Sequence, residues 1–431
     1  MERSADNALG IYLSIPFCRS KCTYCNFASG VYPAAEHERY VEQLIGDMAA
    51  AAAWANEVGA ELPRRVDTVY LGGGTPSLLA PELLANLFAT LREHFPVDAD
   101  AEITVECAPG QLADAIPEAL AAAGVNRVSL GVQSFVDAEA RSSGRLHNRA
   151  TVASDLQRLR AAGIANLNVD LIAGLAGQTP ASWEESLDAL RESGVPHASV
   201  YMLEVDEDSR LGHELLQGGS RYRAKLVPGD ETIAAMYERA VVRLNQAGLR
   251  QYEISNFSRP GLESRHNLRY WQRRPYLGIG LDASSMLRGD PTLAARTKAP
   301  RGWGTQDLVL RATTADDLEE YLAGHKIAER EWLSPERQHE EAWFLGLRMN
   351  AGVDVSALQR EFGPEPVAPA MQTAERLAHD GLLSFAGERV RLTPRGRLMS
   401  NDVFQEFLTT GNSQQGPGIG FPAAQQLEVR G

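Results

Sequence analysis

The chain has 431 residues, 44% of them hydrophobic, which is enough for two or three domains with a sizeable buried core. Its 42 Lys and Arg residues stand against 56 Asp and Glu, giving a net charge of −14. This acidic balance argues against binding to nucleic acid or to anionic lipid, because both need a basic surface. A small-molecule or protein partner is therefore expected.

The composition also bears on the compartment. Residues 1–10 have neither the basic flank nor the apolar run of a signal peptide, and no apolar segment is long enough to cross a bilayer. The chain has four cysteines, three in one cluster and Cys107 far from it, which does not fit the disulfide framework of a secreted protein. These features predict a reducing, cytoplasmic location.

From about residue 11 to 205, short β-branched runs alternate with longer Ala- and Leu-rich segments that have helical spacing. The runs are IYLSI, VDTVYL, AEITVEC, VNRVSLGV, NLNVDLIAG and HASVYMLEV. This pattern predicts an α/β fold of repeated βα units, either a partial TIM-like (β/α)6 barrel or a doubly wound sheet. Five residues at or just beyond the strand ends favour the barrel, because barrel enzymes place their chemistry there: Cys18, Gly73, Glu106, Gln133 and Asp170.

The remaining chain divides into three further parts. Residues 229–333 begin with an amphipathic helix over 229–248 and carry an aromatic-rich segment, so they extend the barrel from 1–228 or cover its mouth. Residues 334–409 read as helices with a short hairpin, like a winged-helix module. Residues 410–431 are rich in Gly, Pro, Gln and Ser, which predicts a disordered tail.

The cysteine cluster CRSKCTYC holds Cys18, Cys22 and Cys25 within eight residues. A structural zinc site needs four ligands, which one compact triad does not supply. Three thiolates can hold a cubane iron–sulfur cluster and leave one iron open to a small molecule. Cys107, in a strand pattern, is interpreted as a buried thiol.

The CxxxCxxC spacing after a strand resembles the signature of the radical S-adenosylmethionine (SAM) superfamily. The resemblance implies a [4Fe–4S] cluster on Cys18, Cys22 and Cys25, with the amino and carboxylate groups of SAM on the fourth iron. The VYLGGGTP segment lacks the GKS/T of a phosphate loop and would by itself be an ordinary turn. In the superfamily a glycine motif at this place meets the amino group of SAM.

Further motifs resemble the HemN/HemW family within that superfamily, over roughly residues 9–408. They are VECAPG, GVQSF followed by GRLHN, and VDLIAGLAGQT. By themselves, their polar residues fit structural hydrogen bonding as well as ligand contact. The resemblance implies SAM contacts from Tyr12, Tyr24, Gly73, Gly74, Thr75, Glu106, Gln133, Arg145 and Asp170. Arg145 would pair with the SAM carboxylate.

Two functions occur in that family, and two departures from one pattern together with a match to another favour one of them. The oxygen-independent coproporphyrinogen III dehydrogenase has CxxxCxxCxC and a longer N-terminal extension, whereas here Cys25 is followed by Asn26 and Phe27. The segment RHNLRYWQ matches the HNxxYW motif of the haem chaperones. The resemblance implies haem bound by His266, Tyr270 and Trp271, with His266 as an iron ligand. A hydrogen-bonded histidine in an aromatic core would explain the same residues.

The sequence therefore favours a haem chaperone over a coproporphyrinogen dehydrogenase, and it assigns no catalytic residue. The expected partners are haem and haem-accepting proteins, with membrane respiratory enzymes as the class that the resemblance suggests; a homodimer stays open. A winged-helix DNA regulator is the third class considered. It fits poorly, because the helix NDVFQEFL has no Arg or Lys for a major groove.

Overall fold

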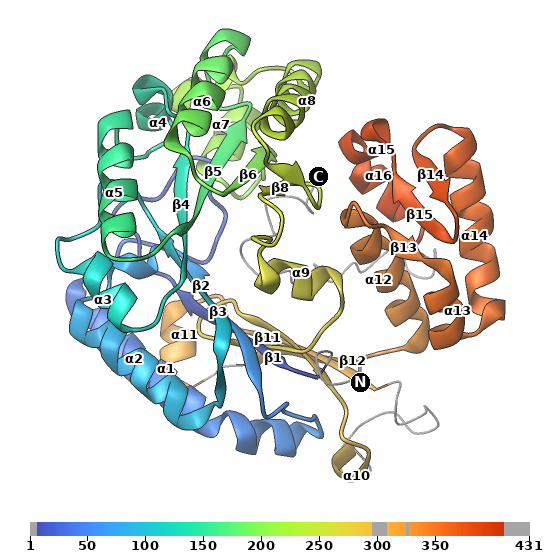
Figure 1. Ribbon diagram of the computed structural model, residues 1–431. Coiled ribbons are helices and arrows are strands. Elements are labelled where there is room, and N and C mark those ends of the chain that lie inside the picture. Colours follow the sequence, from blue (N-terminus) through green and yellow to red (C-terminus); the bar gives the residue numbers. More distant parts are fainter. Residues whose placement is uncertain (1–6, 295–307, 325–326, 409–431) are drawn as a thin grey trace.

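The computed structural model describes residues 7–294, 308–324 and 327–408. Its main feature is a 12-stranded sheet in the order β12-β11-β10-β9-β1-β2-β3-β4-β5-β6-β8-β7. The sheet curves into an open barrel with helices on its outer face, and a second group of helices stands beside it (Figure 1). The partial barrel expected from the sequence is confirmed.

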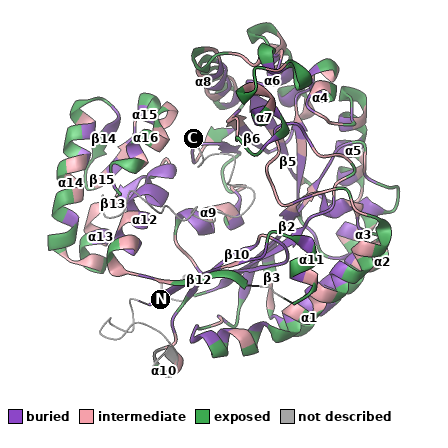
Figure 2. Cartoon of the chain, turned by 180° about the vertical axis from the view of Figure 1, so that it is seen from behind, coloured by how far each residue is buried: buried purple, intermediate pink, exposed green. Residues whose placement is uncertain are grey.

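The six predicted strands form the parallel centre of the sheet. They are β1 (Leu9–Ile15), β2 (Val66–Gly73), β3 (Val97–Cys107), β4 (Arg127–Gln133), β5 (Asn166–Ala173) and β6 (His197–Met202). The helices between them are α1 (Ala34–Val58), α2 (Pro81–His94), α3 (Ile116–Ala122), α4 (Asp137–Ser142), α5 (Arg149–Ala161) and α6 (Pro180–Ser193). Figure 2 shows buried strands and helices whose outward faces are exposed, as expected for a parallel sheet covered by crossover helices.

The helix boundaries follow from local sequence. In α1 the buried positions Tyr40, Leu44, Met48, Ala51 and Ala55 recur at helical spacing, which places one face on the sheet. The helix ends at Gly59, whose φ of 83° suits glycine. Capping boxes at Asn148 and Thr179 start α5 and α6 by accepting hydrogen bonds from the first turn.

Both edges of the parallel centre are extended by further strands, most of which pair antiparallel. β9 (Tyr276–Ile279) pairs in parallel with β1, and β10 (Ser284–Arg288), β11 (Val309–Thr314) and β12 (Ile327–Leu333) continue that edge. On the other edge lie β8 (Asn256–Ser258) and β7 (Arg250–Gln251). The connecting helices are α7 (Arg210–Leu216), α8 (Asp230–Gln246), α10 (Pro291–Ala294) and α11 (Leu318–Leu322), with short 3-10 turns at Pro76–Leu78 and Arg221–Leu226.

A short helix, α9 (Arg265–Trp271), lies inside the curve of the sheet (Figure 1). Arg269 is fully buried and donates to the Ala8 carbonyl at 2.7 Å and to the Asp67 carboxylate. The Glu102 carboxylate accepts from the backbone N–H groups of Arg265 and His266, both at 3.0 Å, and so caps the helix. These bonds fix α9 against the beginning of β2 and the middle of β3.

The C-terminal helices have their own core around the fully buried Trp343. They are α12 (Pro335–Arg348), α13 (Val355–Phe362), α14 (Pro364–His379), α15 (Pro394–Leu398) and α16 (Ser400–Gln405). A small sheet in the order β13 (Val353–Asp354), β15 (Arg389–Leu392) and β14 (Leu383–Ala386) completes this unit.

The domain boundaries suggested at residues 228, 333 and 409 stay predictions. The tail predicted at 410–431 lies outside the described residues. Over the ranges given above, no helix is long and apolar enough to cross a membrane.

Candidate functional site

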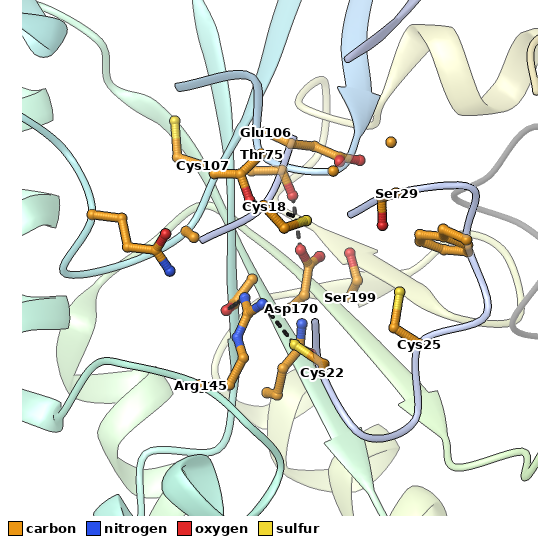
Figure 3. Close-up of a pocket in the computed structure, with 18 of the residues that line it drawn as sticks. Cys18, Cys22, Cys25, Ser29, Thr75, Glu106, Cys107, Arg145, Asp170 and Ser199 are labelled. Atoms are coloured by element: carbon orange, nitrogen blue, oxygen red, sulfur yellow. Dashed lines mark hydrogen bonds between the residues drawn. The ribbon is translucent and has the colours of Figure 1, made fainter. Parts of the chain in front are cut away.

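The cysteine triad lies on the loop that joins β1 to α1, at the carboxyl end of the barrel strands. The loop is held at its base by a hydrogen bond of 2.8 Å from the Cys18 N–H to the Gly30 carbonyl. Cys18, Cys22 and Cys25 line one pocket (Figure 3). Among the described residues no three His, Cys, Asp or Glu side chains are grouped to hold a single metal ion. An iron–sulfur cubane differs from such a site, because each thiolate binds a separate iron.

The thiols of this loop are free and partly shielded from water. Burial and the neighbouring Cys22 raise the pKa of Cys25 to about 11, and burial also raises the pKa of Cys18. Such thiols stay protonated near neutral pH until a metal replaces the proton. Asn26, which stands near the place of the dehydrogenase's extra cysteine, donates to Asp206 at 2.7 Å and ties the loop to the chain after β6.

The glycine turn after β2 is clamped against the cysteine loop. The Gly74 N–H donates to the Ile15 carbonyl and the Thr75 N–H to the Phe17 carbonyl, both at 2.8 Å. A Cβ on Gly74 would lie 2.7 Å from the Phe17 carbonyl oxygen, so only glycine allows this approach. Gly73 has a φ of 101°, which also requires glycine. Without side chains at Gly73 and Gly74, the backbone of this turn lies directly at the pocket wall.

Two carboxylates form part of the pocket wall. Glu106 on β3 accepts a 2.8 Å hydrogen bond from the Tyr70 hydroxyl, and burial raises its pKa to about 7. Asp170 on β5 accepts from Ser129 at 3.0 Å and from Asn168 at 2.6 Å, while burial raises its pKa. The hydrogen bonds fix the carboxylates in one orientation, as a binding site for a polar ligand needs.

Arg145 and Gln133 complete the wall beside Cys22. The Arg145 guanidinium donates to the Cys22 sulfur at 3.4 Å and to the Gly131 carbonyl. Gln133 adopts a φ of 67°, an uncommon conformation for a residue other than glycine. Its Oε1 is buried without a hydrogen-bond partner among the described residues. A strained residue with an unsatisfied buried acceptor fits contact with a bound donor.

Most of the predicted SAM contacts meet in this one pocket. Besides the triad, it is lined by Tyr24, Gly73, Gly74, Thr75, Glu106, Gln133, Arg145 and Asp170. Tyr12 is not among the lining residues: it is buried beside Tyr70, with ring centroids 6.1 Å apart. The structure therefore brings all of the predicted contacts except Tyr12 to the surface of the pocket.

Sequence reasoning missed a set of polar residues deeper in the barrel. They are Arg127, Ser129, Asn168, Ser199, Tyr201 and Asn267. The sequence did hold a signal for them, because every second residue of β4 lines the pocket, as expected for one face of a strand. These residues are Arg127, Ser129, Gly131 and Gln133. Arg127 is 2% exposed, and its Nε has no hydrogen-bond partner among the described residues. Asp170 attracts this guanidinium, but the unsatisfied Nε still offers a buried donor, which fits a bound acceptor such as an anionic group.

The pocket fits a cluster with SAM in its chemistry. Its free space, the open mouth included, is about 1140 Å³. Three thiols face one end, and carboxylates, amides and a guanidinium face the rest. These are the groups that would ligate iron and pair with the ammonium, carboxylate and ribose of SAM.

The HNxxYW motif forms α9 and contributes only Asn267 to this pocket. His266 is 1% exposed, and its Nδ1 and Nε2 lie 2.9 Å from the Thr68 hydroxyl and 2.8 Å from the Tyr270 hydroxyl. Burial holds the pKa of His266 well below its usual range, so the imidazole is neutral. Trp271 packs under the Arg348 guanidinium, 4.1 Å from its ring centroid. In this structure the motif is part of a buried core. Both ring nitrogens of His266 are occupied by hydrogen bonds, so neither is available to bind iron in this conformation.

With the geometry established, comparison with known proteins identifies the family. Residues 12–208 match the radical SAM superfamily, and residues 333–399 match the HemN C-terminal domain. The heme chaperone HemW of Lactococcus lactis subsp. lactis is 32% identical over 92% of this chain and 96% of its own. The heme chaperone HemW of Mycobacterium tuberculosis is 33% identical over 93% of this chain and 94% of its own.

A solved structure agrees with the fold. Coproporphyrinogen III oxidase (HemN) from Escherichia coli superposes with a TM-score of 0.77 at 22% identity, covering 94% of this chain and 91% of that one. At this identity the likeness supports the fold alone. On the full-length sequence likeness to the HemW proteins, the chain belongs to the HemW family of the radical SAM superfamily.

Proposed function

We propose that this protein is a haem chaperone, which binds haem and transfers it to acceptor proteins. The observation that carries the proposal is the likeness to HemW proteins over more than nine-tenths of both chains, at 32% and 33% identity. Asn26 and Phe27 after the triad support the same branch, since the dehydrogenase pattern has a further cysteine there.

The family implies a [4Fe–4S] cluster and SAM, and we assign their contacts to the barrel pocket. Cys18, Cys22 and Cys25 would hold the cluster, which when reduced can supply an electron to SAM. Arg145 would meet the SAM carboxylate, and Gly73 and Gly74 would meet its amino group. The fixed carboxylates and the bonded glycine turn then orient the ligand before any reaction.

For the haem, His266, Tyr270 and Trp271 remain the residues suggested by the resemblance. Ligation of iron by His266 would require one ring nitrogen to leave Thr68 or Tyr270. Such a change would free part of α9 from its place in the barrel. The haem site therefore includes either a rearranged α9 or other residues nearby.

The acceptors are haem-accepting proteins, with membrane respiratory enzymes as the proposed class. A cytoplasmic location agrees with free thiols at Cys18, Cys22, Cys25 and Cys107, which need a reducing environment. Oxygen-independent coproporphyrinogen III dehydrogenation is the second candidate, because it is the other function of the HemN/HemW family that the motifs resemble.

An anaerobic assay separates the two functions. The reconstituted protein is given SAM, a reductant and coproporphyrinogen III, while haem is titrated in parallel by absorbance. We expect saturable haem binding without decarboxylated product. Catalytic conversion to protoporphyrinogen would instead make the protein a dehydrogenase.

The ligand assignment has its own test. Replacing Cys18, Cys22 and Cys25 by Ala should remove cluster iron and sulfide after reconstitution. Cys107→Ala is the matched control, because Cys107 lines the same pocket but lies on β3 outside the triad. Equal iron content in the triple variant and the control would exclude the triad as the cluster ligands.

A further inference from the structure

A second cavity lies where the barrel meets the C-terminal helices. It is bounded by the chain after α9, the end of β10, the first turns of α12 and the end of α13. Its free space, the open mouth included, is about 1440 Å³. The lining begins at Gln272, the residue directly after the HNxxYW motif.

The cavity is basic in an acidic protein. Its walls carry Arg273, Arg274, Arg288 and Arg360 against Glu336 and Glu361, an excess of two positive charges, whereas the chain has a net charge of −14. His339 also lines the cavity, but burial lowers its pKa, so it adds no charge at neutral pH. This local excess predicts an anionic ligand.

Two of these arginines are already held in place. Arg273 forms a forked ion pair with Glu361, with distances of 3.0 and 2.6 Å, and its guanidinium lies 5.5 Å from the Phe362 ring centroid. Arg274 pairs with Asp67 at 3.0 Å. The first pair joins the barrel to α13 and the second holds Arg274 against β2, so together they fix part of the cavity wall.

The other two arginines are free to bind a ligand. Arg288 at the end of β10 and Arg360 on α13 are exposed, and neither has a carboxylate partner within the described part of the chain. They therefore present two guanidinium groups from two elements on either side of the domain junction.

The backbone at the wall of the cavity has an unusual conformation at Arg273. Arg273 has a φ of 52° and directly follows the C-cap of α9, a place where glycine or asparagine is favoured. This conformation is strained for an arginine, and the side chain that it positions at the cavity wall is the one that pairs with Glu361.

We propose that this cavity, called the arginine cavity below, binds the two propionates of haem through Arg288 and Arg360. The proposal rests on the haem-chaperone function above and names a site for its cargo. Guanidinium groups match carboxylates with forked, charge-assisted hydrogen bonds. Pro335, Phe362 and Pro366 supply apolar surface beside the arginines for the edge of the macrocycle. The open mouth suits a cargo that must leave again.

The test compares haem with its dimethyl ester, in which both propionates are uncharged. Binding is followed by absorbance with the anaerobic full-length protein. The unaltered protein should bind haem about ten- to a hundredfold more tightly than the ester, the range expected for losing charge-assisted hydrogen bonds. Arg288→Gln/Arg360→Gln should bring haem affinity down to that of the ester and leave ester binding unchanged.

A matched double variant, Arg64→Gln/Arg250→Gln, removes two exposed arginines outside the cavity. It should bind haem as the unaltered protein does, which separates a local site from the general charge. Equal haem affinity in both double variants, or equal weakening in both, would overturn the arginine cavity while leaving the chaperone function standing. Lack of haem binding by the unaltered protein would instead reject the chaperone function itself. The ester comparison requires no substitution, so equal affinity for haem and ester would overturn the proposal even if a variant folds poorly.

Discussion

The hydroxyl of Tyr70 donates a 2.8 Å hydrogen bond to Oε1 of Glu106. The opposite side of the same residue contacts the HNxxYW helix, since the Tyr70 ring stacks on His266 with centroids 5.3 Å apart. One side chain on β2 thus touches both the barrel pocket and α9. Changes at either place should be measurable at the other.

Glu106→Gln should change how stability depends on pH. The pKa of Glu106 is raised from 4.5 to about 7 by burial, so between these pH values the folded state binds more protons than the unfolded state. This carboxyl therefore lowers the free energy of unfolding as pH rises through that window, by at most about 3 kcal/mol. The variant lacks this slope and should be the more stable protein at pH 8.

Urea unfolding of the ligand-free protein at pH 5 and pH 8 measures the difference between the two proteins. The comparison uses the difference in unfolding free energy between the unaltered protein and the variant. Asp170 and Glu204 have raised pKa values too, and their contribution is common to both proteins. The same variant should bind SAM about tenfold more weakly, since it loses a charged acceptor. A variant with the unaltered pH slope would show that Glu106 is ionised in the fold.

Gly74→Ala should disturb the cysteine loop. The new Cβ would lie 2.7 Å from the Phe17 carbonyl oxygen and 2.9 Å from that of Ile15, so β1 or the loop must move. We expect a loss of about 1–3 kcal/mol in unfolding free energy and a lower iron content after reconstitution. Gly46→Ala is the control: it lies on α1 with nothing within 4 Å of its Cβ, and should gain about 0.5–1 kcal/mol. Normal cluster content in Gly74→Ala would contradict the clamped-turn description.

The parts of this fold that could be predicted are those that repeat. The six β-branched runs correspond to β1 to β6, because their apolar residues are buried in the parallel sheet and recur between helical segments. The extra strands were harder to predict: β7 has two residues and β8 three, too few to show a period.

In the candidate site, too, only the residues with a local sequence pattern could be predicted. Gln133 and Asp170 were predicted because they end apolar strands, and both line the pocket. Arg127 was missed because it begins β4, and its side chain reaches the pocket from the opposite end of the strand. The burial of His266 depends on Thr68 and Glu102, which lie more than 160 residues away in the sequence, so no local pattern could indicate it.

Arg127→Met should separate ligand binding from folding. Because the buried Nε of Arg127 has no partner among the described residues, an apolar side chain of similar length should leave the ligand-free protein about as stable as before. SAM binding, measured by calorimetry, should weaken. Arg269→Met is the contrast, since it removes the buried hydrogen bonds of Arg269 to the Ala8 and Pro275 carbonyls and its ion pair with Asp67, and should cost about 3–5 kcal/mol. Similar destabilisation by both substitutions would mean that Arg127 is paired within the fold.

His266→Ala tests the HNxxYW motif by stability and by spectrum. The substitution leaves a cavity and removes the hydrogen-bond partner from the hydroxyls of Thr68 and Tyr270, so we expect a loss of about 2–4 kcal/mol in unfolding free energy. Tyr270→Phe removes only one hydroxyl and should cost about 1–2 kcal/mol. The predicted role as an iron ligand requires in addition that the Soret band of bound haem shifts in His266→Ala and returns when imidazole is added. A lower stability with an unshifted Soret band would assign His266 to the core of the barrel and leave the iron to another ligand.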